Sequence, residues 1–451
     1  MTALWTAHDL IAATGGHLST PFAATGVSID SRTLAPGDLF VALRGESGDG
    51  HAHLDAAFAR GAAGAMVHDA KAGGPLLRVA DTLAGLTALG RFARARFTGR
   101  LLAITGSIGK TTAKEMLRTI LAAEAPTHAA VASYNNHWGV PLTLARLPPG
   151  AAFCVAEIGM NHAGEIAPLA RLARPHVAII TTIAAAHVGH LGSLDAIAAE
   201  KAAILSGLEP GGVAVLPADS PHLPRLREAV GAARVLTFGA AEGAEVRLLG
   251  FTGDAAGSEV TGVVSGARIG FRLPAPGRHM AINALAAIAA AAAVGIPATR
   301  AAAALAGFAP LAGRGAQRPI LDGAAVLLDE SYNASAPAVV AALEVLALIP
   351  ARRRLAVLGE MLELGAHAEA EHLSLAGPVA QSADLLYACG AQMRRLFDAV
   401  PEGRRGGHAP DAAALAPLVA AAVRPGDAVL VKGSLGSRMN LVVRALERGA
   451  R

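Results

Sequence analysis

The clearest chemistry in this sequence belongs to a glycine-rich stretch that follows an apolar run, Leu101-Leu-Ala-Ile-Thr-Gly-Ser-Ile-Gly-Lys-Thr-Thr112. Glycines let consecutive backbone N–H groups converge on phosphate oxygens, and a helix that begins here adds its positive end. Lys110 can place its charge beside terminal phosphates, and Thr111 can offer a hydroxyl to Mg²⁺. We therefore predict that a nucleoside triphosphate binds to Thr105, Gly106, Ser107, Ile108, Gly109, Lys110, Thr111 and Thr112.

The stretch is shorter than the general phosphate-loop pattern. That pattern has a glycine five residues before Gly109, where this chain has Ile104. An incidental glycine-rich turn between a strand and a helix is the alternative. The Lys-Thr pair directly after the glycines makes this alternative the weaker one.

Three further polar residues stand where chemistry is plausible. Glu157 ends an apolar run, and a buried carboxylate is costly unless it meets a cation. His187 follows another apolar run, and Lys201 lies in the helical pattern of residues 198–204. Each has an ordinary alternative: a solvated glutamate at a strand end, a packed or capping histidine, and a solvated lysine.

Apolar runs that alternate with alanine-rich helical segments must position these residues. Such alternation is typical of a doubly wound α/β layer with a parallel sheet. A chain of 451 residues exceeds one hydrophobic core. We predict three α/β domains, at residues 1–98, 99–313 and 314–451. The predicted strands are 27–30, 38–43, 65–67, 101–105, 152–158, 177–182, 212–216, 325–329, 354–358, 384–389 and 428–432, with a helix at 82–97.

Composition argues against several classes of protein. Hydrophobic residues make up 53% of the chain, but alanine is the largest part of them, and no run of about 20 strongly apolar residues occurs. The first residues lack the pattern of a secretory signal. Two cysteines cannot build a disulfide framework, and a net charge of +4 with only 4% aromatic residues disfavours nucleic-acid binding. We expect a cytoplasmic protein without membrane insertion.

The phosphate loop and several other segments resemble the Mur ligases of peptidoglycan synthesis. These segments follow the family's order over nearly the whole chain: Asp30-Ser31-Arg32, Leu39 to Leu43, Asn135-Asn136, Gly139 to Pro141, Glu157 to His162, Ala184 to His187, Gly277 to His279, Asn283 to Leu285, Glu330 to Ala334 and Gly359 to Gly365. Tyr332-Asn-Ala-Ser335 favours the branch of the family that adds a dipeptide.

The resemblance implies the three-domain Mur ligase architecture, with a central phosphate-loop ATPase domain that has a parallel sheet and a C-terminal Rossmann-like domain. It implies an ATP- and Mg²⁺-dependent ligase that adds D-alanyl-D-alanine to UDP-N-acetylmuramoyl-tripeptide through an acyl phosphate. The first domain would bind the UDP-linked substrate, the second ATP, and the third would close over ATP and D-alanyl-D-alanine. We expect a monomer with small-molecule substrates only.

The resemblance also implies roles for single residues. Metal ligands would be Thr111, Glu157, His187 and Lys201, with Lys201 carbamylated by CO₂. Catalytic residues would be Lys110, Lys201, His187 and Asn136. Further nucleotide contacts would come from Asn283, Arg314, Asp329 and Glu330. Contacts to the other substrates would come from Ser31, Arg32, Asp49, His51, Tyr332 and Asn333.

Three other functions compete with this one. A phosphate-loop kinase of a small metabolite would leave the segments around Asn283 and Tyr332 unexplained. A nucleotide-binding regulator would bind tightly and turn over negligibly. Folylpolyglutamate synthase shares the central domain but lacks the opening domain that carries Asp30-Ser31-Arg32.

Overall fold

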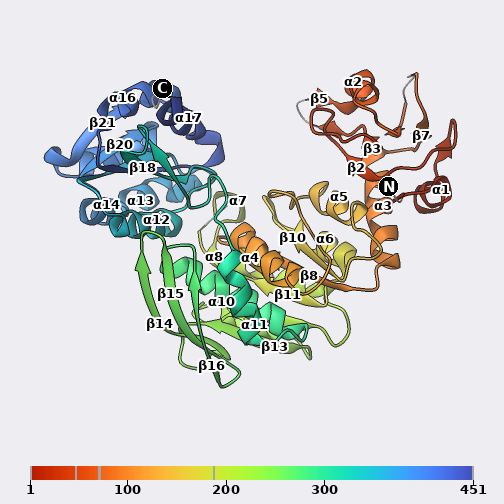
Figure 1. The fold of residues 1–451 in the computed structure, drawn as a ribbon, viewed down its shortest axis with the longest axis horizontal. Coiled ribbons are helices and arrows are strands. Elements are labelled where there is room, and N and C mark those ends of the chain that lie inside the picture. Colours follow the sequence, from red (N-terminus) through yellow and green to blue (C-terminus); the bar gives the residue numbers. More distant parts are fainter. Residues whose placement is uncertain (1–2, 46–47, 70–72, 186–187, 449–451) are drawn as a thin grey trace.

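A computed structural model describes residues 3–45, 48–69, 73–185 and 188–448 of the chain. Three α/β units follow one another along the sequence, and each contains its own sheet. In Figure 1 the first and third units stand apart from each other, and both adjoin the middle unit. The predicted strands and the helix at 82–97 are confirmed, with ends that differ by a few residues.

The first unit is built on a five-stranded sheet in the order β1-β7-β6-β3-β2, which is parallel except for β1. A short hairpin, β4–β5, lies beside it. Its elements are α1(Ala7–Thr14), β1(His17–Leu18), β2(Gly26–Ser28), β3(Asp38–Val41), β4(Arg44–Gly45), β5(Gly48–Asp49), η1(Gly50–His53), α2(Leu54–Ala59), β6(Gly64–Val67), β7(Leu76–Arg78) and α3(Thr82–Arg96).

The middle unit has a nine-stranded sheet in the order β16-β15-β14-β13-β12-β11-β8-β10-β9. Its elements are β8(Arg100–Thr105), α4(Lys110–Ala122), β9(Thr127–Ala129), α5(Gly139–Ala145), β10(Phe153–Glu157), α6(Ile166–Ala173), β11(Val177–Ile180), α7(Val188–Leu191), α8(Leu194–Ala202), η2(Ala203–Gly207), β12(Val213–Pro217), α9(Leu223–Val230), β13(Arg234–Gly239), β14(Val246–Asp254), β15(Gly257–Val264), β16(Ala267–Leu273), α10(Arg278–Ala293), α11(Ala298–Ala304) and η3(Leu305–Gly307).

Both faces of the parallel part of this sheet are buried. Along β8, Leu102 and Ile104 belong to the core under α4 and α10, whereas Leu101 and Ala103 belong to the core under α5 and α6. Successive side chains of a strand point to opposite faces, so a strand covered on both sides is apolar throughout. This arrangement aims the carboxyl end of β8 into the glycine-rich stretch and the start of α4.

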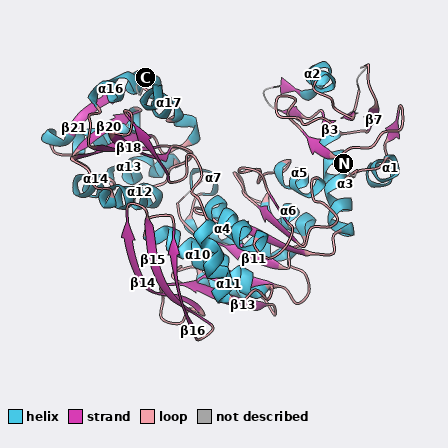
Figure 2. Cartoon of the chain, in the orientation of Figure 1, coloured by secondary structure: helices cyan, strands magenta, loops and turns pink. Residues whose placement is uncertain are grey.

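An antiparallel extension of this sheet was not predicted. Strands β14, β15 and β16 form a curved meander that runs toward the third unit, as Figure 2 shows. At its tip, the Ala255 carbonyl accepts a hydrogen bond of 2.7 Å from Gln317 Nε2 of the third unit. The middle unit therefore supports the third one at a second place besides the connecting chain.

The third unit has a six-stranded sheet in the order β17-β18-β22-β19-β20-β21, parallel except for β17. Helices cover both of its faces. Its elements are β17(Ala316–Ile320), β18(Ala325–Glu330), α12(Ala336–Leu348), β19(Arg353–Gly359), η4(Gly365–His367), α13(Ala368–Leu373), α14(Ala376–Ser382), β20(Leu385–Cys389), α15(Ala391–Ala399), η5(Glu402–Arg404), β21(Arg405–Ala409), α16(Ala412–Ala422), β22(Asp427–Lys432), η6(Leu435–Ser437) and α17(Asn440–Arg448).

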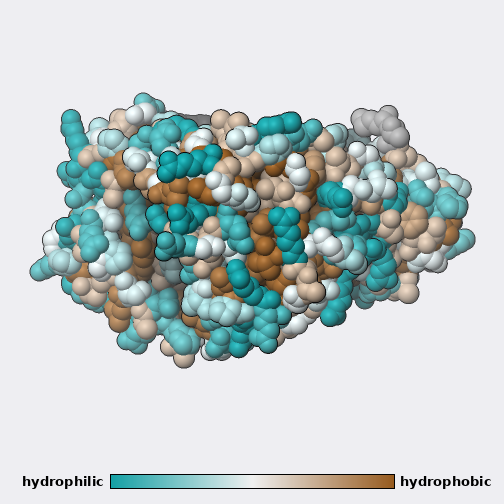
Figure 3. Space-filling model, turned by 90° about the horizontal axis from the view of Figure 1, so that it is seen from below, coloured by the Kyte–Doolittle hydropathy of each residue, from teal (hydrophilic) through white to brown (hydrophobic). Residues whose placement is uncertain are grey.

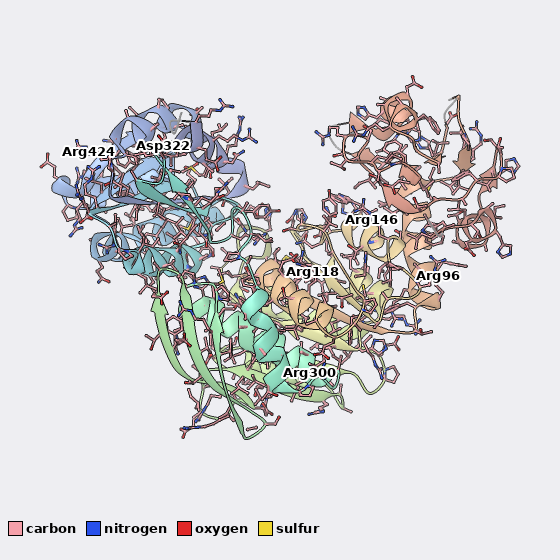
Figure 4. All side chains as sticks on the ribbon, viewed as in Figure 1. Arg96, Arg118, Arg146, Arg300, Asp322 and Arg424 are labelled. Carbon is pink, nitrogen blue, oxygen red and sulfur yellow. The ribbon has the colours of Figure 1, made fainter. Side chains whose placement is uncertain are left out.

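The first and middle units are packed together through α3 and α5, whose residues share one core. Trp5 Nε1 donates to the Ala145 carbonyl at 2.9 Å, and Arg146 Nε donates to the Val27 carbonyl at 2.5 Å. Arg96 stacks on Trp5 at 4.4 Å, and Figure 4 shows Arg96 and Arg146 at this junction. These contacts hold the first unit against α5 of the middle unit.

Figure 3 shows polar and apolar residues mixed over the face that it views. Within the described residues, no helix is both long enough and apolar enough to cross a bilayer.

Candidate active site

The glycine-rich stretch connects β8 to α4 and requires its two glycines. Gly106 has φ 145° and Gly109 has φ 84°, which are values that favour glycine. A Cβ on Gly109 would lie 2.5 Å from Asn283 Oδ1, and a Cβ on Gly106 would overlap the Thr181 hydroxyl. The backbone therefore passes close to its neighbours and begins a helix with free N–H groups, the geometry that holds phosphate.

Lys110 folds back over this loop. Its Nζ donates to the Gly106 carbonyl at 2.7 Å. Burial lowers the pKa of Lys110 from its ordinary value, Glu157 opposes this shift, and Arg314 adds to it. An ammonium held against backbone carbonyls in this way is ready to exchange them for phosphate oxygens.

Glu157 and Thr111 meet at the carboxyl end of β10. The Thr111 hydroxyl donates to Glu157 Oε2 at 2.9 Å, and Asn135 Nδ2 donates to Glu157 Oε1 at 2.8 Å. Ser133 Oγ lies 3.1 Å from Thr111 Oγ1. The Glu157 side chain is almost fully buried, and both of these hydrogen-bond donors belong to the middle unit.

Arg314 reaches this group from the chain that connects the middle and third units. Its Nη2 donates to Ser133 Oγ at 3.0 Å, and its guanidinium lies 4.1 Å from the centre of the Tyr332 ring. The predicted linker arginine is thus directed at the phosphate loop. Its positive charge contributes to the lowered pKa of Lys110.

A cavity of about 610 Å³ lies between the middle and third units and unites most of the predicted residues. Its wall includes Ser107, Ile108, Gly109, Lys110, Thr111, Thr112, Glu157, Asn283, Arg314, Glu330, Tyr332 and Asn333. The described wall does not include Thr105, Gly106, Asn136, Lys201 or Asp329.

Asp329 and Glu330 are engaged within the protein. Asp329 Oδ2 accepts from the Gly313 N–H at 2.9 Å and from Arg318, while Oδ1 accepts from the Ser331 hydroxyl at 2.7 Å. Glu330 Oε2 accepts from Lys432 Nζ at 3.0 Å. Asp329 thereby orders the connecting chain beside Arg314, whereas Glu330 faces the cavity.

Lys201 lies on α8 with a side chain that is 0% exposed. Its Nζ has no hydrogen-bond partner among the described residues. Burial, followed by the nearby charge of Lys110, lowers the pKa of Lys201 well below its ordinary value. A buried amine without a partner is costly as an ammonium, so burial favours the neutral form of Lys201. His187 lies outside the described residues.

Asn136 and the predicted residues of the first unit lie away from this cavity. Asn136 Oδ1 accepts from the Gly139 N–H at 3.0 Å and thus caps α5. Ser31 is buried beside Arg32, which binds Asp30 through Nε at 2.9 Å and Nη2 at 2.8 Å. This pair lowers the pKa of Asp30 to about 2.

Asp49 and His51 form a second polar group in the first unit. Asp49 Oδ1 lies 2.5 Å from His51 Nδ1, and the His68 N–H donates to His51 Nε2 at 3.2 Å. Hydrogen bonds from His51 and Arg44 lower the pKa of Asp49. The structure brings Asp49 and His51 together.

Ser133, Asn135 and His279 are among the cavity residues that were missed as site residues. Ser133 and Asn135 lie on the segment before α5, and His279 lies near the start of α10 with Nδ1 unpartnered among the described residues. Burial lowers the pKa of His279, which keeps its ring neutral. Asn135 and His279 belong to segments that carried the family resemblance, which was the available signal, whereas Ser133 had none.

The donor set suits magnesium bound together with phosphate. Among the described residues, no three His, Cys, Asp or Glu side chains gather closely enough to hold a metal ion by themselves. Magnesium usually binds one or two carboxylates, with substrate phosphates and water as its other ligands. Glu157 and the Thr111 hydroxyl, next to the phosphate loop, meet this requirement.

Three family models match the chain in sequence order. The Mur ligase family catalytic domain matches residues 23–86, the Mur ligase middle domain matches 104–291, and the Mur ligase glutamate ligase domain matches 316–435. Together they cover the three units described above.

Similar proteins are known in sequence and in structure. The UDP-N-acetylmuramoyl-tripeptide–D-alanyl-D-alanine ligase of Escherichia coli (strain K12) is 36% identical over 427 residues, which are 93% of each chain. A crystal structure of MurF from Acinetobacter baumannii is 30% identical, with a TM-score of 0.86 over 98% of this chain and 99% of that one. MurF from Thermotoga maritima in complex with ADP is 25% identical, with a TM-score of 0.80 over 94% and 97%. The chain belongs to the Mur ligase family.

Proposed function

We propose that this protein is the ATP-dependent ligase that joins D-alanyl-D-alanine to UDP-N-acetylmuramoyl-tripeptide through an acyl phosphate. One observation carries the proposal: the phosphate loop, Glu157 and Arg314 of the connecting chain meet in a single cavity between two units. The relatives that match over 93% of the chain bear the name of this ligase. A phosphate-loop kinase or a nucleotide-binding regulator does not need a third unit whose connecting chain places an arginine at the phosphate loop.

The reaction follows from the charges around the loop. The terminal carboxylate of the tripeptide attacks the γ-phosphorus of ATP, the bond to ADP breaks, and an acyl phosphate forms. The amine of D-alanyl-D-alanine then attacks the acyl carbon, loses a proton, and displaces inorganic phosphate. Lys110 and Arg314 neutralise the phosphoryl oxygens during transfer. Closure of the third unit excludes water that would hydrolyse the acyl phosphate.

Thr111 and Glu157 would hold one Mg²⁺ ion, and His187 with Lys201 would hold a second. Magnesium would supply charge neutralisation for the triphosphate. The unpartnered amine of Lys201 supports carbamylation, in which the neutral nitrogen bonds to CO₂ and releases a proton. The product is an anion that suits a site between cations.

The remaining residues have proposed roles that follow their places in the fold. Asn283, beside Gly109, would contact the adenine, and Asp329 and Glu330 would contact the ribose or order the chain around it. Asn136 would act by fixing α5 and, with it, the segment that carries Asn135.

The substrates would divide among three domains at residues 1–98, 99–313 and 314–451. Ser31, Arg32, Asp49 and His51 would bind the UDP-linked substrate in the first, and Tyr332 and Asn333 would meet D-alanyl-D-alanine in the third. We propose a monomer that works in the cytoplasm, where ATP is available.

The test is to incubate the protein with MgATP, UDP-N-acetylmuramoyl-tripeptide and D-alanyl-D-alanine and to weigh the product. We expect a pentapeptide product, with phosphate released only when the dipeptide is present. A phosphorylated small molecule without phosphate release would identify a kinase. Tight nucleotide binding with no turnover would identify a regulator.

A further inference from the structure

A second lysine of α4 lies one helical turn beyond Lys110 and is more deeply buried. Lys114 is 0% exposed. Its Nζ donates to the Ala130 carbonyl at 2.7 Å and to the Ala132 carbonyl at 2.5 Å. It also forms an ion pair of 3.0 Å with Glu115. An ammonium is buried only where its donors are satisfied, so these two carbonyls and the Glu115 carboxylate determine where it lies.

The two carbonyls belong to a segment with an unfavourable backbone. Ala132 has φ 50°, a left-handed conformation that residues with a Cβ rarely adopt. The ends of the segment are held by the sheet: the Ala130 N–H donates to the Val155 carbonyl at 3.0 Å, and the Asn135 carbonyl accepts from the Gly159 N–H at 2.8 Å. Between these ends, Lys114 is positioned to hold the turn at Ala132.

This turn places two side chains on the proposed metal ligands. Ser133 lies against Thr111 and receives the hydrogen bond of Arg314, and Asn135 donates to Glu157. Ala132 directly precedes Ser133, so relaxation of its backbone would move Ser133 away from Thr111. A chain of contacts therefore connects the Lys114 amine, through the carbonyls of Ala130 and Ala132, to Ser133 and Asn135 beside the phosphate loop.

We propose that Lys114 is a positioning residue that holds the turn 130–135 in its left-handed form and thereby sets the magnesium requirement of the site. The proposal rests on the proposed function only in its last step, because the shape of the turn is a property of the protein alone. If Lys114 merely filled the core, replacing it would lower the stability of the protein. The exchange of the turn and the magnesium requirement would then stay as they are in the wild type.

Four variants separate these roles. Lys114→Met keeps the volume and removes both hydrogen bonds. Ala132→Val opposes a positive φ at an exposed position and leaves Lys114 in place, so it remains informative even if the first variant fails to fold. Arg118→Met is the control, because Arg118 is exposed on the same helix and pairs with the same Glu115. The double variant Lys114→Met/Ala132→Gly restores the preference for a positive φ.

The first measurement is hydrogen exchange of the backbone amides of residues 130–136 in the nucleotide-free protein. We expect exchange at least tenfold faster in Lys114→Met and Ala132→Val, no change in Arg118→Met, and partial recovery in the double variant. The second is a MgCl₂ titration of ligase activity. Loss of groups that orient metal ligands typically costs about 10–100-fold, so we expect a rise of that order in the half-saturating concentration. The KM for the UDP-linked substrate should stay within about twofold, because its UDP end is proposed to bind in the first unit, away from the turn 130–135.

The outcomes are distinct. If Lys114→Met and Ala132→Val exchange at the rate of Arg118→Met, or if the double variant is no better than Lys114→Met, the proposal is overturned. If exchange changes as expected and the half-saturating MgCl₂ concentration does not, the link to the metal site is wrong. A wild-type protein that makes no amide refutes the proposed function instead, and the exchange result then still decides whether Lys114 holds the turn.

Discussion

Replacing Gly109 with alanine tests the phosphate loop with a change of one methyl group. At φ 84° the alanine is strained by about 1–2 kcal/mol, as for other left-handed residues. Its Cβ would also lie 2.5 Å from Asn283 Oδ1, so either Asn283 or the loop must move by roughly 1 Å to reach an ordinary contact distance. A misplacement of that size costs on the order of 100-fold in rate.

Two variants separate the strain from the displacement. Gly211 has φ 75° and open space where the methyl group of an alanine would lie, so Gly211→Ala carries similar strain without a clash. Gly109→Ala/Asn283→Ala removes the clash but keeps the strain. Both single glycine variants should lose about 1–2 kcal/mol in the free energy of unfolding, measured with urea.

Nucleotide binding should distinguish them. By titration calorimetry with MgADP, we expect at least tenfold weaker binding for Gly109→Ala and wild-type affinity for Gly211→Ala. If the double variant binds MgADP more tightly than Gly109→Ala does, the gain comes from relief of the clash. The gain is smaller if Asn283 itself contacts the nucleotide, because the double variant loses that contact. If Gly109→Ala binds MgADP as well as the wild type does, the loop does not hold the phosphates and the site is misassigned.

Three further changes have defined outcomes. Lys110→Ala should abolish pentapeptide formation while the circular dichroism spectrum is unchanged; near-normal turnover would show that the loop is not the phosphate site. Arg314→Met removes the guanidinium that lies beside Ser133 and Tyr332 at the phosphate loop. A hydrogen bond from this charge to the transferring phosphoryl group would be worth roughly 2 kcal/mol, so kcat/KM should fall about 30-fold, and a fall under threefold would contradict its role. Arg32 lowers the pKa of Asp30 in the folded protein to about 2. The ionised Asp30 therefore stabilises the fold above pH ~4, the ordinary pKa of an aspartate, and this stabilisation is lost as the pH falls through about 2. In Arg32→Ala an NMR titration should place the Asp30 pKa near 4, and a value still near 2 would show that the backbone, not Arg32, sets it.

Local patterns were sufficient to predict the parallel core of the fold. Strands such as β8 and β10 are apolar on both faces and are followed by helical segments, so their type and order follow from the sequence. The meander β14–β16 was missed because β15 and β16 alternate buried and exposed residues and β14 is largely half-buried, unlike the fully apolar runs that were sought. The Ser265-Gly266 turn, with φ values of 48° and 87°, was a hairpin signal within that segment.

The site was predictable where one segment carries the chemistry and unpredictable where distant segments meet. Lys110 and Thr111 follow from their own loop. The contact of Ser133 with Arg314, 181 residues away, depends on how the middle and third units pack. The contact of Lys114 with the Ala132 carbonyl depends on how α4 packs against the segment before α5 within the middle unit. Asn136 illustrates the converse, because its side chain caps α5 although its neighbour Asn135 faces Glu157.

The most direct test of the whole account follows oxygen from the peptide acid to phosphate. UDP-N-acetylmuramoyl-tripeptide labelled with ¹⁸O in its terminal carboxylate is incubated with the protein, MgATP and D-alanyl-D-alanine, and the released phosphate is analysed by mass spectrometry. An acyl phosphate intermediate requires that one ¹⁸O atom appear in each phosphate released with a molecule of pentapeptide. Pentapeptide formed with unlabelled phosphate, or without consumption of ATP, would contradict the claim that this loop transfers a phosphoryl group to a peptide carboxylate.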